Sequence, residues 1–173
     1  MKLNTNYWNR IFLFGAGVFI GTAFCMKWME RDFLIKGEKF SILGLELFYT
    51  REKMISIISG LDNHTRKILS YHLYFDFAFM AGVYPGIAAL CMMARKKPAL
   101  LLLKKLLTIV ACLQLLAWAC DIIENCYLLS WIQKPVIGND LGLFHFIVGA
   151  KWVIVLCGIF LSLLSLLGIK KNK

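Results

Sequence analysis

The chain has 173 residues, of which 60% are hydrophobic and 17% charged. This composition argues against a soluble globular protein, and the length is that of one domain. The net charge of +10 is confined to the termini and one internal loop, so we expect basic membrane flanks and no binding of nucleic acid.

Four apolar segments follow one another along the chain, at about 11–29, 70–94, 106–132 and 143–169. Each approaches or exceeds the roughly 20 residues that a membrane-spanning helix needs. The prediction is therefore an all-α fold, in which residues 1–173 form a single membrane domain built as a four-transmembrane-helix bundle.

The unbalanced basic residues predict the orientation of this bundle. They lie before the first segment, between the second and third, and after the fourth, and no acidic residue lies among them: Lys2, Arg10, Arg95, Lys96, Lys97, Lys104, Lys105, Lys170, Lys171 and Lys173. The positive-inside rule then places both termini in the cytoplasm, N-in and C-in. A bacterial inner (plasma) membrane is favoured. The C-terminal Lys170-Lys171-Asn172-Lys173 leaves the endoplasmic reticulum membrane as the alternative.

The first segment contains Gly17 and Gly21, one helical turn apart. Small residues at this spacing allow a second helix to approach closely in a membrane. A chance pair of glycines is the equally simple interpretation.

Residues 30–69 form an outer segment, which we predict to cover the bundle as a lid. The part at 40–49 is expected to be extended or to lie in the membrane interface. Thr50 is expected to cap an interfacial helix that Gly60 ends, and Asp62 or Asn63 to cap the helix that follows.

Polar side chains inside the apolar segments define a candidate site. At 1.5 Å per residue, Asp76, Asp121 and Lys151 each lie about 24–28 Å from the basic end of their own segment. Ionisable groups inside a membrane are costly and often functional, and these three helices bring them to one height. The expected ligand-binding residues are His72, Asp76, Trp118, Asp121, Glu124, Asn125, Lys151 and Trp152.

Four interpretations of this cluster stay open. It could be a structural network in which Lys151 neutralises Asp121 or Glu124, a ligand pocket, a catalytic site, or a path for ions or protons. Recognition of a lipid-like or amphiphilic ligand, or of a membrane partner, is favoured, with membrane lipids or a second copy of the chain as further partners. The alternative is a membrane-embedded enzyme that acts on a lipid.

In the enzyme interpretation the catalytic residues would be Asp76, Asp121 and Glu124, as acid, base or ligands. These acids could alternatively ligate a metal together with histidines, and His72, Asp76 and His145 are weak candidates for that role. No HExxH or HxxxH motif is present, so no metal and no cofactor is predicted.

Several of these residues also carry a resemblance. Tyr74-x-Asp76, Tyr84-Pro85, Asp121-x-x-Glu124-Asn125 and Lys151-Trp152, together with Tyr49-Thr50 and Arg66, resemble an uncharacterised family of small four-helix membrane proteins with a D…DxxEN…KW pattern. The architecture is also similar to the EXPERA group of sterol isomerases and the sigma-2 receptor. That second resemblance implies intramembrane acids that hold an amine in a lipid-facing cavity.

Overall fold

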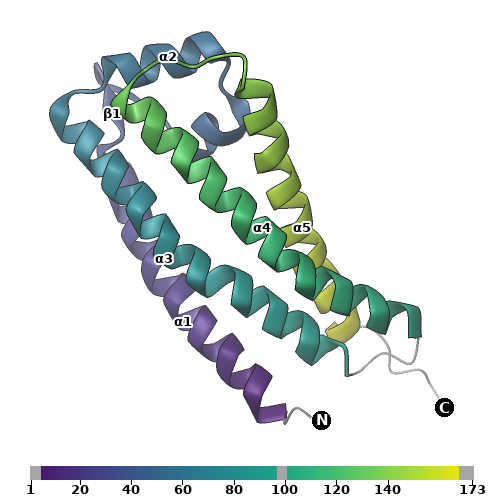
Figure 1. Cartoon of the computed structure of the whole chain (residues 1–173). Helices are drawn as coiled ribbons and strands as arrows, with labels where there is room; N and C mark the ends of the chain where they lie inside the picture. Colours follow the sequence, from purple (N-terminus) through teal and green to yellow (C-terminus); the bar gives the residue numbers. More distant parts are fainter. Residues whose placement is uncertain (1–4, 97–100, 168–173) are drawn as a thin grey trace.

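The computed structural model describes residues 5–96 and 101–167. Four long helices dominate it: α1 (Thr5–Met29), α3 (Asn63–Ala94), α4 (Leu101–Gln133) and α5 (Leu141–Leu167) (Figure 1). All four are long and apolar enough to cross a membrane, which confirms the all-α prediction and its four apolar helices. All four begin earlier than the apolar segments suggest, and in α3 polar residues such as Asn63 and Arg66 continue the helix beyond the apolar run.

The four helices do not contribute equally to the bundle. Helices α3, α4 and α5 pack against one another, whereas α1 packs almost entirely along α3 (Figure 1). Only 6% of the residues in the apolar stretch of α1 are buried within the protein. Helix α1 begins and α5 ends at the same end of the bundle, which fits an even number of crossings.

Glycines set the contact between α1 and α3, although not the predicted pair. A Cβ atom on Gly15 would lie 2.7 Å from the Gly82 carbonyl oxygen, and one on Gly82 would lie 2.7 Å from the Phe19 amide nitrogen. Backbones therefore meet directly at these positions. Gly17 and Gly21 face open space, so the expectation of close helix contact at this pair is wrong within the chain.

The outer segment between α1 and α3 is more structured than the sequence suggests. A short 3-10 turn (Glu30–Asp32) leads to a hairpin of β1 (Leu34–Ile35) and β2 (Glu38–Lys39), whose turn contains Gly37 with a φ of 86°. A π-helical turn, η2 (Gly44–Phe48), follows, so an extended course for 40–49 is wrong. The Tyr49 ring lies against Gly44, where no side chain would fit, and its hydroxyl accepts a hydrogen bond from the Ser41 amide at 3.3 Å.

Helix α2 (Arg51–Gly60) completes the outer segment with the predicted boundaries. The Thr50 hydroxyl accepts from the Lys53 amide at 3.4 Å, and the Asp62 carboxylate accepts from the Thr65 amide at 2.7 Å at the start of α3. These are N-caps of the expected kind. Backbone and side-chain hydrogen bonds from Thr65 hold the pKa of Asp62 below its usual value.

The outer segment packs on the bundle as part of its core. Phe33, Leu45, Met54 and Ile58 are buried in one apolar cluster with residues of α3, α4 and α5. Two arginines connect the outer segment and the start of α3 to the end of α4 and to the loop that follows it. Arg51 donates to the Ile137 carbonyl at 2.8 Å, and Arg66 donates to the Ile132 carbonyl at the end of α4.

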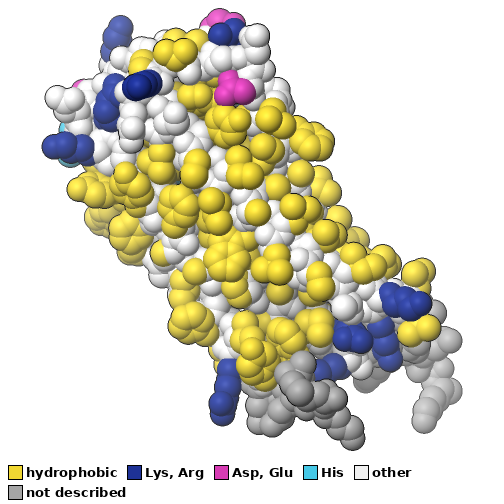
Figure 2. Space-filling model, in the orientation of Figure 1, with side chains coloured by type: hydrophobic (Ala, Val, Ile, Leu, Met, Phe, Trp, Pro, Cys, Tyr) yellow, Lys and Arg dark blue, Asp and Glu magenta, His cyan; other side chains and the backbone are white. Residues whose placement is uncertain are grey.

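The surface is divided into zones along the bundle axis. On the face shown in Figure 2, hydrophobic side chains cover the middle of the molecule and charged side chains collect at its two ends. Acidic side chains are visible only at the end that carries α2. We call this the outer end and the opposite end the inner end. Lys2, Lys97, Lys170, Lys171 and Lys173, which contribute to the predicted inner charge, lie outside the described residues.

Candidate functional site

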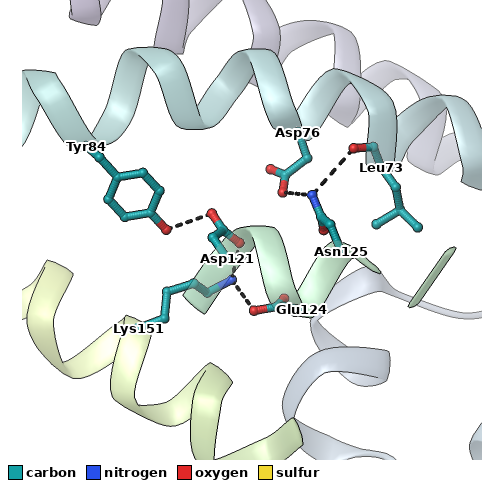
Figure 3. A network of polar contacts seen from close by, with 7 residues as sticks. All are labelled: Leu73, Asp76, Tyr84, Asp121, Glu124, Asn125 and Lys151. Atoms are coloured by element: carbon teal, nitrogen blue, oxygen red, sulfur yellow. Dashed lines mark hydrogen bonds and ion pairs between the residues drawn. The ribbon is translucent and has the colours of Figure 1, made fainter. Parts of the chain in front are cut away.

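The centre of the candidate site is a buried ammonium group between two carboxylates (Figure 3). The Lys151 Nζ atom lies 2.8 Å from Asp121 Oδ1 and 2.5 Å from Glu124 Oε2. Asp121 and Glu124 are one helical turn apart on α4, and Lys151 reaches them from α5. The three residues are at most 6% exposed. The predicted counter-charge is thus confirmed, and Lys151 serves both acids rather than one.

A second polar pair lies beside this centre. The Asn125 amide on α4 donates to Asp76 Oδ2 on α3 at 2.7 Å and makes a longer contact of 3.5 Å with the Leu73 carbonyl (Figure 3). Tyr84, two turns further along α3, donates its hydroxyl proton to Asp121 Oδ2 at 2.6 Å. The matched heights estimated from the sequence therefore correspond to real proximity of α3, α4 and α5.

Glu46, which the sequence did not suggest, adds a fourth carboxyl group to the site. It projects from η2 and lines the same cavity as Asp76, Asp121 and Lys151. Burial raises the pKa of Glu46 to about 7, against the attraction of Lys151, and Asp76 and Asp121 raise it further. A single acid inside the apolar run Leu43-Gly44-Leu45-Glu46-Leu47-Phe48 was the one available signal.

Tyr84 was also absent from the predicted site residues. Its position eight residues after Asp76 places both on one face of α3, which was the available signal. Its ring stacks on Trp118 of α4 with a centroid separation of 6.2 Å. Trp118 thus packs against the face of the Tyr84 ring.

The charges of the site do not balance. Four carboxyl groups, Glu46, Asp76, Asp121 and Glu124, meet one ammonium group, Lys151. Full ionisation would leave three uncompensated negative charges in a largely apolar surrounding, which is energetically prohibitive. The excess carboxyl groups must carry protons or meet another cation.

An apolar cavity opens from this polar cluster, and we call it the chamber. It has a volume of about 390 Å³ and lies between α1, α3 and α5 beneath η2. Glu46, Asp76, Asp121 and Lys151 lie on its lining, and the remainder is apolar: Phe19, Met26, Ile42, Leu43, Phe79, Val83, Tyr84, Trp152, Val155 and Ile159.

A second cavity, which we call the groove, continues from the chamber toward the inner end. It has a volume of about 360 Å³ and shares Phe19, Val83 and Ile159 with the chamber. No polar side chain lines it. From Asp76 to Leu90, the chamber and groove follow α3 for about 21 Å at 1.5 Å per residue.

The remaining predicted residues lie in two places. His72 is buried above Asp76 on α3 and lines a smaller polar cavity near the outer end. His145 lies on α5 beside Phe144, at the outer end of that helix. Among the residues that the structure describes, no group of three His, Cys, Asp or Glu side chains is arranged to hold a metal ion. The weak metal candidates His72, Asp76 and His145 are therefore not brought together as ligands.

Comparisons with protein-family models, with curated proteins and with solved structures find no match to this chain. These comparisons therefore give no support to the resemblance to the family with the D…DxxEN…KW pattern. They give none to the resemblance to the EXPERA group either. The site must be interpreted from its own geometry.

Proposed function

We propose that this chain is an integral membrane protein of a bacterial inner membrane, with both termini in the cytoplasm. Four apolar helices, an apolar middle zone and basic residues at the inner end support this arrangement. In it, the carboxyl site lies in the outer half of the membrane and α2 lies at the outer interface.

Labelling with a membrane-impermeant thiol reagent tests the orientation. Cysteine introduced for Glu38, in the exposed hairpin, should react from outside intact cells, and cysteine introduced for Lys105 should react only after the membrane is permeabilised. Peptide mass spectrometry separates these positions from the native cysteines. Reaction of position 105 from outside would reverse the orientation.

We further propose that the protein binds a lipid-like amphiphile, with its polar head at the carboxyl site and its tail in the chamber and groove. The observation that carries this proposal is the amphipathic cavity: charged groups gather at one end, and from Asp76 the largely apolar cavity follows α3 for about 21 Å. Ligand pockets commonly combine a largely apolar wall with a few polar groups that orient the ligand.

The polar end of the cavity favours an amphiphile whose head group carries a positive charge or donates hydrogen bonds. The excess carboxyl groups would accept from an ammonium or hydroxyl group. The indole N–H of Trp152 is buried and has no acceptor among the described residues, although Trp152 lines the chamber. A hydroxyl oxygen of the head would satisfy that donor.

The test uses purified protein in lipid nanodiscs and single-chain amphiphiles with one tail: hexadecylamine, hexadecanol and palmitic acid. The amine or the alcohol should raise the unfolding temperature, because a ligand that binds only the folded state stabilises it. Val83→Trp should fill the chamber and abolish the effect. Leu115→Trp, on the exposed surface of α4, is the matched control and should preserve it.

The fatty acid should stabilise the protein least, because its carboxylate would add to the excess negative charge. Equal stabilisation by all three amphiphiles in both tryptophan variants would indicate non-specific partition into the nanodisc. The proposed function would then be wrong.

A membrane-embedded enzyme acting on a lipid is the second candidate, and Glu46 is the observation that favours it. A carboxyl group with a pKa of about 7 can both accept and release a proton near neutral pH, as general acid–base catalysis requires. Glu46 lines the chamber with Asp76 and Asp121. Incubation with a lipid extract, followed by mass spectrometry, would show a product that Glu46→Gln fails to form.

A further inference from the structure

A polar cavity lies between the carboxyl site and the outer end of the molecule, and we call it the vestibule. Its volume is about 180 Å³. α1 contributes Lys27 to its lining, the 3-10 turn contributes Glu30, α3 contributes His72 and Asp76, and η2 contributes Glu46. Polar side chains therefore make up a larger share of its lining than of the chamber's, although Ala23, Met26, Ile42, Leu73 and Phe79 line it as well.

The vestibule joins the chamber at the carboxyl site. The two cavities share Glu46 and Asp76 on their linings, together with Met26, Ile42 and Phe79. At its other end the vestibule reaches the ion pair of Lys27 and Glu30, whose atoms are 2.5 Å apart; the lysine side chain is 80% exposed. A polar route thus connects the exposed outer surface with the buried acids.

His72 gives the strongest indication of what fills this route. Its side chain is 1% exposed, yet neither ring nitrogen has a hydrogen-bond partner among the described residues. The nearest acid, Glu30 Oε1, is 3.9 Å from Nε2, which is too long for a direct hydrogen bond. Buried polar atoms of this kind are normally satisfied by ordered water.

The size of the vestibule agrees with this expectation. Water occupies about 30 Å³ per molecule in the liquid, so the cavity has room for about six molecules. The surrounding donors and acceptors could each bind one: Lys27, Glu30, Glu46, His72, Asp76 and Asn125.

We propose that a water-filled path past His72 connects the carboxyl site with the outer aqueous phase, and that the excess carboxyl groups gain and lose protons along it. The site would then have two entrances: the chamber and groove for an apolar chain, and the vestibule for water and protons. This inference does not depend on the proposed amphiphile, because it is argued from the vestibule, the unpaired imidazole and the excess carboxyl groups; it rests on the proposed membrane orientation.

The charged groups around the path determine where protons are held. At the mouth, Lys27 of α1 and Glu30 of the 3-10 turn form an ion pair, and Arg31 and Lys39 line the adjoining surface pocket. Four carboxyl groups lie at the inner end, where Lys151 of α5 is the one cation that opposes them among the described residues: Glu46 of η2, Asp76 of α3, and Asp121 and Glu124 of α4. Protons are therefore held most strongly at the inner end of the path.

Hydroxyl-radical footprinting of the unchanged protein in nanodiscs tests whether water reaches His72. Radicals form in water and attack side chains that contact it. His72 should be oxidised, whereas Met80, which is equally buried on the same helix and does not line the vestibule, should not. Methionine is intrinsically the more reactive side chain, so this order cannot arise from chemistry alone. An unlabelled His72 would refute the proposal.

Proton exchange provides the second test. The carbonyl band of protonated carboxyl groups in the infrared spectrum shifts when the protein is transferred to D₂O, and the rate of the shift reports access. His72→Phe should slow the shift at least ten-fold by filling the vestibule with an apolar ring. His72→Gln, which keeps hydrogen-bonding groups, should exchange about as fast as the unchanged protein. A fast His72→Phe variant, or an equally slow His72→Gln variant, would contradict the water path.

Discussion

The outer and inner halves of the bundle are held together by different means. In the outer half, charged side chains of α3, α4 and α5 meet around Lys151, and cavities adjoin them. In the inner half, helices meet through glycine and hydroxyl groups. A Cβ on Gly158 would lie 2.8 Å from Ile87, and Ser165 donates to the Ala94 carbonyl at 2.9 Å. Among the described residues, the inner half is therefore joined without buried charge, and the groove that runs along it has an apolar lining.

This difference indicates which half of the protein has features that stability alone does not explain. Small residues and hydroxyl–backbone hydrogen bonds suffice to join helices in a membrane. Four carboxyl groups around one lysine make the outer half harder to fold, because each buried charge must be compensated. The outer half is consequently the place to look for function, and three predictions test the contrast.

The largest effect should come from Lys151→Met. This change leaves Asp121 and Glu124 buried without their cation, and loss of one partner from a buried pair typically costs about 3–5 kcal/mol. The free energy of unfolding, measured by denaturant titration in mixed micelles, should fall by that amount.

Combining Lys151→Met with Asp121→Asn and Glu124→Gln should recover much of the loss, since no unpaired charge then remains. If the losses simply add, the ion pairs do not hold the outer half together. A recovered variant that no longer binds the amphiphile would show that the site serves binding beyond its structural role.

A smaller effect is expected for Gly15→Val, which tests glycine contact between helices. The new side chain would meet the backbone of α3 near Gly82, and forced overpacking typically costs about 1–3 kcal/mol. Gly17→Val is the matched control on α1, because that position faces open space. It should change the free energy of unfolding by less than about 0.5 kcal/mol. Equal effects at both positions would mean that helix propensity, not contact with α3, decides the result.

The third expected effect is a pH dependence due to Glu46. Its pKa in the folded protein is about 7, against 4.5 for the unperturbed group. A raised pKa means that the stabilising contribution is fully present below about pH 4.5 and is lost as the pH rises through about 7. The unfolding temperature of the unchanged protein should therefore fall between pH 5 and pH 8. Glu46→Gln should flatten this fall, and an identical pH profile would show that Glu46 does not titrate in this range.

Much of the fold could be predicted from the sequence because its signals are local. Apolar runs predict the four helices, and Thr50 and Asp62 mark helix starts through hydrogen bonds to residues three positions away. The meeting of Asp121 with Lys151 was also predictable, since the rise per residue converts sequence position into depth.

Contacts between distant segments were not predictable in this way. Depth along a helix does not tell which helices are neighbours, so the position of α1 beside α3, and the pairing of Gly15 with Gly82, had no sequence signal. Glu46 was missed for a related reason. Its segment lies outside the spans, and only the turn at Gly44–Phe48 directs its carboxyl group back into the bundle.

The order in which Lys151 and its partners are synthesised has a consequence for biogenesis. Lys151 follows Asp121 by 30 residues, so α4 leaves the ribosome before its counter-charge exists. An acid at the centre of a lone membrane helix costs roughly 2.5–3.5 kcal/mol on insertion scales, and α4 carries two acids. The loop 134–140 that joins α4 to α5 is short. In the proposed membrane arrangement, helices α4 and α5 should therefore enter the membrane together, as a hairpin that carries its own neutralising lysine.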